Sequence, residues 1–188
     1  MAITEVGRAL RAEREVALVL AATPSGPLAH AIDAYRQAAA VRVGANAAHR
    51  SPPHCPLARS CCAHPSAVSA YRDALAATLT DRRGECPVMV TTLITDSAWH
   101  GLEIESPFLL AFAAGVAERA ASLTRRQHVT VQRHLRLALA NGFEASDHDA
   151  LSELAHRIVD PTLPAGWDVG LWQRANETWG CLWQARVG

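Results

Sequence analysis

Residues 87–95 read PVMVTTLIT, and the fold expected for this chain depends on how that run is interpreted. Its β-branched content is typical of a buried strand. The neighbouring segments carry helical patterns, however, so a strand here would have no partner. We therefore interpret residues 87–95 as a helix, which makes the expected fold class all-α.

The central element of that fold is expected over residues 107–122. Pro107 precedes FLLAFAAGVAERAASL, a run that is apolar nearly all round in its first half, as in a buried helix. Apolar spacing and capping signals predict further helices over residues 3–21, 27–39, 68–79, 124–141, 146–158 and 168–186. The prediction is a single domain over 1–188, a bundle of seven or eight helices with a Cys/His/Pro-rich loop at about 44–65.

The composition of the chain limits its expected partners and cellular location. The chain has 188 residues, is 49% hydrophobic and has a formal net charge of zero, so neither nucleic acid nor an anionic membrane is an expected partner. No apolar run is long enough to cross a bilayer, and the opening MAITEVGRALRAERE does not resemble a secretory signal. We therefore expect a cytoplasmic protein with reduced thiols.

All eighteen basic residues are arginine, so the chain is lysine-free. A lysine Schiff base, a phosphate-binding loop lysine and a Ser-Lys dyad are thereby excluded. The arginines are unevenly spread, because residues 119–143 are basic and residues 144–160 are mostly acidic. We expect these consecutive segments to pair their charges at the surface in preference to offering a basic helix to phosphate.

The stretch HCPLARSCCAHP, residues 54–65, concentrates soft metal ligands in the predicted loop. Thiolates and imidazoles are the preferred ligands of zinc, and thiolates also hold iron-sulfur clusters. Five residues separate Cys55 from Cys61, wider than an orthodox zinc motif. The candidate metal ligands, for zinc or an iron-sulfur cluster, are Cys55, Cys61, Cys62, His64 and Cys86.

The alternative is an enzyme. One loop cysteine would act as the thiolate nucleophile, with His64 or His54 as its base. A carboxylate/His metal site is a further alternative, because Glu153 and His156 stand one helical turn apart and Asp96 precedes His100 by four residues. We favour an exposed helix face for the first of these pairs.

Four of the five tryptophans lie near the C-terminus, in GWDVGLWQRANETWGCLW. Trp172, Trp179 and Trp183 would share one face of a helix. Such a stripe suits either the core or the binding of a protein partner or an apolar small molecule.

The segment EASDHDALSELA, residues 144–155, resembles the acidic Asp-His stretch of the helical maturation chaperones of molybdenum oxidoreductases. The resemblance implies a wholly helical accessory protein and assigns no functional residue. The function expected from the sequence is a helical binding or accessory protein, with a metal-binding Cys/His loop and a tryptophan-rich helix for partner or ligand contact.

Overall fold

The computed structural model describes residues 16–63, 68–82, 86–123, 129–175 and 178–187. Within them the chain forms eight strands in two antiparallel sheets together with four α-helices. In chain order the elements are β1 (Val16–Ser25), α2 (Pro27–Val43), η1 (Ala47–Arg50), β2 (Cys55–Ala63), α3 (Val68–Asp81), β3 (Met89–Asp96), β4 (Trp99–Glu105), α4 (Pro107–Leu123), β5 (Val129–Val131), β6 (Leu135–Asn141), η3 (Ala145–Asp147), α5 (His148–Ile158), β7 (Gly166–Ala175) and β8 (Thr178–Val187).

The prediction of an all-α bundle is therefore wrong, and residues 87–95 show why. They lie mostly in β3, whose partner is the strand that follows it, β4. The two strands form a hairpin in which Asp96 is paired with Trp99. In β4 the side chains of His100, Leu102 and Ile104 are buried, and Glu103 between the last two is less buried, as expected for a strand with one face in the core.

The larger sheet has the strand order β5-β2-β1-β7-β8, and β1 lies at its centre. Residues 18–22 of β1 are all buried, because the strand is covered on both faces. A short, continuous apolar run of this kind cannot be told from a buried helix by periodicity alone. This is the physical reason why the sequence favours a helix over residues 3–21, of which residues 3–15 lie outside the described part of the chain.

The predicted C-terminal helix is also a pair of strands. Residues 166–175 and 178–187 form the antiparallel hairpin β7-β8, in which Leu171 is paired with Trp183 and Arg174 with Trp179. Trp172, Trp179 and Trp183 therefore do not share a helix face. The predicted helix over residues 124–141 likewise contains β5 and β6, and in β6 the buried Leu135, Leu137 and Leu139 alternate with other residues.

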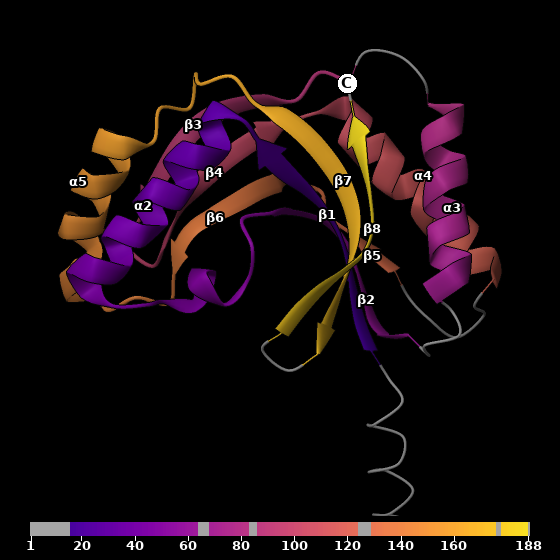
Figure 1. Cartoon of the computed structure of the whole chain (residues 1–188), viewed down its shortest axis with the longest axis horizontal. Coiled ribbons are helices and arrows are strands. Elements are labelled where there is room, and N and C mark those ends of the chain that lie inside the picture. The colour runs from indigo at the N-terminus through magenta and orange to yellow at the C-terminus, as the bar shows by residue number, and fades with distance from the viewer. Residues whose placement is uncertain (1–15, 64–67, 83–85, 124–128, 176–177, 188) are drawn as a thin grey trace, which may run out of the picture.

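Four predicted helices are confirmed, as α2, α3, α4 and α5. They form two pairs: α2 packs beside α5 and against β1 and β6, while α3 packs beside α4, which covers β2 and β5. Figure 1 shows the two pairs at opposite sides of the molecule with the strands between them. Ser146 and Asp149 have the spacing of a capping box in the sequence, but α5 begins after Asp147 with no side-chain cap.

The smaller sheet has the order β3-β4-β6. Its edge strand β6 contacts β2 of the larger sheet, and the backbone of Arg136 hydrogen-bonds the thiol of Cys55 at this junction. The buried core extends across both sheets and all four helices. Among the described helices, none is long and apolar enough to cross a membrane.

Candidate functional site

A cavity of about 650 Å³ lies where the two sheets and the η1 segment meet. Five arginines line it, and no aspartate or glutamate is among the lining residues. The arginines are Arg36, Arg50, Arg59, Arg136 and Arg174. Together with one histidine and two tryptophans, they make a concave surface that favours an anionic ligand carrying a planar ring.

Two β-bulges bring side chains of β2 and β6 into this cavity. The pairing of β1 with β2 skips Leu57, so Pro56 and Arg59 both line the cavity while Leu57 and Ala58 are buried. The pairing of β4 with β6 skips Leu139 in the same way. A bulge reverses the inward and outward alternation of a strand, which is why bulges often accompany binding sites.

In β6 the bulge at Leu139 similarly turns side chains on both sides of it toward the cavity. Ala138 and Asn141 both line the cavity, although they stand three positions apart, and Leu139 and Ala140 are buried between them. Arg136 lies on the same side of the strand as Ala138. The cavity wall is therefore built from Arg136, Ala138 and Asn141 of the smaller sheet.

His54 stands directly before β2 and is the histidine of the cavity. Its Nδ1 lies 2.8 Å from the carbonyl oxygen of Pro52, so Nδ1 carries the proton and donates it. In the neutral ring, Nε2 then keeps a lone pair. Trp179 packs beside the imidazole, with ring centroids 4.9 Å apart.

Electrostatics keep His54 in its neutral form. Burial lowers the pKa of His54 below 6.5, and the positive charges of Arg59 and Arg36 lower it further, against the opposing effect of the Pro52 carbonyl. A neutral imidazole with a free Nε2 can accept a hydrogen bond or a proton from a ligand hydroxyl.

Arg36 of α2 holds the segment that carries His54. Its side chain is only 8% exposed, and its guanidinium donates to the carbonyl oxygens of Ala48 and of Ser51, the second at 3.0 Å. His49 of the same segment also contacts Arg36, because its Nε2 lies 2.9 Å from the backbone oxygen of Arg36. Much of the hydrogen-bonding capacity of Arg36 is thus committed to the loop before His54.

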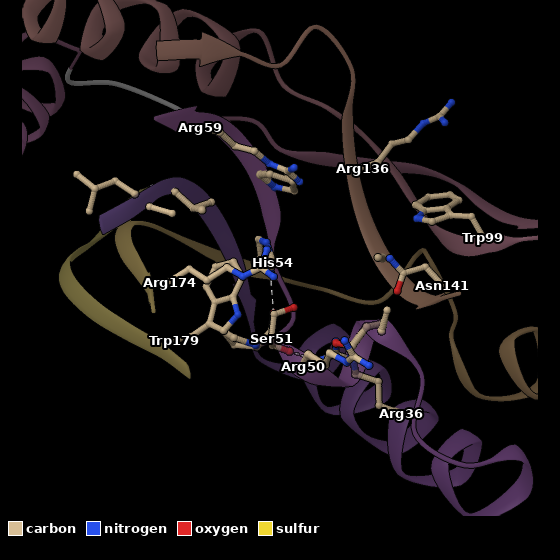
Figure 2. Close-up of a pocket in the computed structure, with 18 residues that line it drawn as sticks. Arg36, Arg50, Ser51, His54, Arg59, Trp99, Arg136, Asn141, Arg174 and Trp179 are labelled. Carbon is tan, nitrogen blue, oxygen red and sulfur yellow. Dashed lines mark hydrogen bonds between the residues drawn. The ribbon is translucent and has the colours of Figure 1, made fainter. Parts of the chain in front are cut away.

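The opposite end of the cavity is formed by Trp99, Arg136 and Asn141, as Figure 2 shows. The guanidinium carbon of Arg136 lies 5.5 Å from the centroid of the Trp99 ring, and Glu103 pairs with Arg136 at 3.7 Å. Arg59 projects from β2, is exposed, and has no hydrogen bond or ion pair with any other described residue. It is therefore available to a ligand.

A second histidine stands in a similar sequence setting. His54 and His134 each directly precede a strand and are followed, three positions on, by a fully buried leucine, Leu57 or Leu137. The backbone N–H of Gln132 donates to the carbonyl of Leu57 at 2.8 Å, which holds the segment before His134 against β2. His134 itself is exposed.

The predicted metal ligands are not brought together among the described residues. Cys55 begins β2 and is fully buried, Cys61 and Cys62 lie in the same strand, and Cys86 precedes β3. His64 lies outside the described residues. No group of three or more His, Cys, Asp or Glu side chains that could hold a metal ion occurs in the described chain, so the zinc or iron-sulfur assignment stays a prediction without structural support.

Cys61 is part of strand β2 and not of the predicted loop. Burial raises the pKa of Cys55 to about 12, so this thiol is a poor candidate for the nucleophile of the alternative enzyme. Glu153 and His156 do lie on one helix, α5, but Glu153 pairs with Arg157 at 3.7 Å. Asp96 and His100 lie on neighbouring strands of a hairpin and not on a helix.

Of the predicted partner-binding tryptophans, Trp179 lines the cavity, while Trp172 and Trp183 lie elsewhere on the β7-β8 hairpin. Their binding to a partner stays untested. The arginine-lined cavity is not predicted from the sequence, because it is built by residues distant in the chain, among them Trp99 and Asn141. One available signal was the repeated spacing of HCPL and HLRL, at residues 54–57 and 134–137.

The expected charge pairing between the basic and acidic segments is not found for Arg119 and Arg136, while Arg125 and Arg126 lie outside the described residues. Arg119 of α4 pairs with Asp81 of α3, and Arg136 pairs with Glu103 of β4. Arg136 thus lines the cavity instead of crossing to the acidic segment.

No protein-family model matches this chain. Over 162 residues it is 32% identical to the ubiquitin-associated and SH3 domain-containing protein B of Mus musculus, and equally to that of Homo sapiens. The alignments cover 83% of this chain and 25% and 24% of those proteins. The chain thus spans about a quarter of the length of these curated relatives.

Among solved structures, E. coli LigT is similar over most of both chains. The complex with ATP has a TM-score of 0.50 at 15% identity, covering 92% of this chain and 98% of LigT. The complex with 3'-AMP has a TM-score of 0.52 at 14% identity, and the apo form 0.53 at 12%, each covering 93% of this chain and 98% of LigT. The chain therefore has the fold of LigT.

This fold corrects the expected function. A wholly helical accessory protein, as implied by the resemblance of residues 144–155 to maturation chaperones, is excluded by two antiparallel sheets and by the likeness to LigT. The cavity at the junction of the sheets replaces the Cys/His loop as the candidate site.

Proposed function

We propose that this chain is an enzyme that binds a nucleotide-like phosphoester and cleaves a phosphodiester bond in the cavity around His54. The observation that carries the proposal is the lining: five arginines and no carboxylate surround a histidine that burial keeps neutral. Guanidinium groups match phosphate oxygens in geometry and charge.

The comparisons support the ligand class. LigT has been crystallised with ATP, NADP+, phosphate and 3'-AMP, all of which carry phosphate and three of which carry an adenine nucleotide. In this chain, Trp99 and Trp179 add flat apolar surfaces to the basic lining. A phosphate with an attached planar ring uses both features.

The chemistry follows from the state of His54. Its Nε2 accepts a proton from a hydroxyl, either water or a hydroxyl of the substrate, as that oxygen forms a bond to phosphorus. The bond from phosphorus to the leaving oxygen breaks, and that oxygen takes a proton from a second group. Arg59 and Arg136 offset the negative charge on the phosphoryl oxygens.

His134 is the candidate for the second group. It precedes β6 as His54 precedes β2, and it stands two residues before Arg136 of the cavity wall. Histidine is the side chain used most often to transfer protons in catalysis.

The experiment is a cleavage assay on a dinucleoside monophosphate, with the nucleoside and nucleotide products separated by chromatography. His54→Gln and His134→Gln are each expected to lower kcat by about 100-fold or more, since general acid or base catalysis contributes 10²–10⁴-fold. His30→Gln is the matched control, because His30 is exposed on α2 and does not line the cavity. No turnover by the wild-type protein, or full activity in His54→Gln, would refute the proposal.

A further inference from the structure

We infer that Trp99 and Asn141 form a nucleobase subsite that selects an adenine ring. The inference rests on the proposed function, because it assigns the ring of the same phosphorylated ligand. Trp99 of β4 and Asn141 of β6 are cross-strand partners, and both line the cavity. Side chains at directly paired positions begin about 5 Å apart, so one ligand ring can touch both.

The indole of Trp99 is held in a fixed place. A Cβ atom at Gly101 would lie 2.4 Å from two carbons of the indole and equally close to the Leu137 carbonyl oxygen. The ring therefore crosses the glycine, and any larger residue there would displace it. Arg136 lies over the same ring, and its side chain is 50% exposed. A planar base can replace this guanidinium on the indole, which releases Arg136 toward the phosphate.

Asn141 supplies the hydrogen bonds that distinguish one base from another. Its side-chain Oδ1 is buried and has no hydrogen-bond partner among the described residues. A buried acceptor without a donor is costly, so a ligand N–H placed there adds affinity. The same carboxamide carries N–H donors, and the pair matches the exocyclic amine and N7 of adenine, which asparagine reads in nucleic acids.

The other bases fit less well. Guanine and hypoxanthine present a carbonyl oxygen where adenine has its amine, so Oδ1 would face an acceptor. A pyrimidine is smaller and covers less of the indole. The bulge at Leu139 is what turns Asn141 toward the ligand, since it returns that side chain to the cavity side of β6.

The test is calorimetric titration of the wild-type protein with 3'-AMP and with 3'-IMP, which differ in the group at position 6 of the ring and in the proton on N1. The wild-type protein is expected to bind 3'-AMP about tenfold more tightly than 3'-IMP. This ratio is at the low end of the discrimination that one bidentate asparagine–adenine pairing provides. In Asn141→Ala the dissociation constants of the two nucleotides should agree within about twofold. The variant should lose affinity for 3'-AMP and keep its affinity for 3'-IMP. The wild-type comparison needs no variant, so it holds even if Asn141→Ala folds poorly.

Two results overturn the inference in different ways. If both nucleotides bind wild type equally and Arg59→Ala weakens both, the adenine subsite is wrong while the phosphate site stands. If neither nucleotide binds, the proposed function fails and the subsite fails with it. A preference for 3'-AMP that persists in Asn141→Ala also rejects Asn141 as the selecting residue.

Discussion

The Nδ1 atom of His54 is 2.8 Å from the carbonyl oxygen of Pro52, two residues earlier in the chain. This contact fixes the tautomer of the ring and leaves Nε2 unprotonated. The arginines around the ring disfavour a second proton. The geometry therefore prepares a base before any ligand arrives.

The pH dependence of His54 follows from this setting. Because burial and the charges of Arg59 and Arg36 lower the pKa of His54 below its ordinary value of 6.5, the midpoint of its titration should lie below pH 6.5. An NMR titration of the imidazole checks this, and cleavage should fall along the same curve. Arg59→Ala should move the midpoint upward. A wild-type midpoint at or above 6.5 would contradict the assigned environment.

Arg36 is expected to position His54 without touching the ligand. Arg36→Met leaves the carbonyls of Ala48 and Ser51 without their charged donor, so we expect a loss of about 2–4 kcal/mol in the free energy of unfolding. The specific readout is the nitrogen NMR of His54, which should change from one tautomer to a mixture as Pro52 shifts. Arg42→Met, an exposed change on the same helix, is the control. A pure Nδ1–H tautomer in Arg36→Met would show that Arg36 only stabilises the fold.

His100 should make the protein sensitive to acid. Burial, with the nearby charge of His148, lowers the pKa of His100 to about 4, while its ordinary value is 6.5. The unfolded chain therefore binds the proton first, and stability falls as the pH drops from 6.5 to 4, by on the order of 3 kcal/mol. His100→Leu should flatten this part of the stability curve in urea denaturation. An unchanged slope would place the acid sensitivity elsewhere.

The described thiols should differ in reactivity. Cys181 is exposed on β8, whereas Cys55 is fully buried with its pKa raised to about 12. Alkylation with iodoacetamide at neutral pH, followed by mass spectrometry, should label Cys181 long before Cys55. Rapid labelling of Cys55 would mean that the start of β2 opens readily, which the packing of Leu57 and Ala58 does not suggest.

The sequence was sufficient for the helices and insufficient for the sheets. Pro27 and Pro107 begin helices, as proline at a first turn predicts, and the apolar spacing from Val68 onward marks α3. The helix predicted for the run PVMVTTLIT is wrong because strand formation depends on pairing between two segments. Its partner, WHGLEIE, follows after only three residues, but a periodic pattern within one run does not reveal the partner.

The site was missed for a related reason. Arg36, Arg59, Trp99 and Asn141 come from four different elements, and only the folded arrangement brings them around one cavity. Local spacing drew attention to the cysteines of residues 54–65, where the important side chain is His54. The bulges at Leu57 and Leu139, which decide what faces the ligand, leave no local pattern that periodicity would reveal.

The central claim is that the arginine-lined cavity recognises phosphate. It is tested most directly by titrating the protein with 3'-AMP and with adenosine, which differ by the phosphate alone, while following tryptophan fluorescence. Trp99 and Trp179 lie in the cavity and should report binding. We predict that 3'-AMP binds at least about tenfold more tightly than adenosine, since charge-assisted pairing to phosphate contributes roughly 1.5–3 kcal/mol. The difference should shrink in Arg59→Ala and persist in the control Arg42→Ala. Equal affinity of wild type for the two ligands would contradict the account.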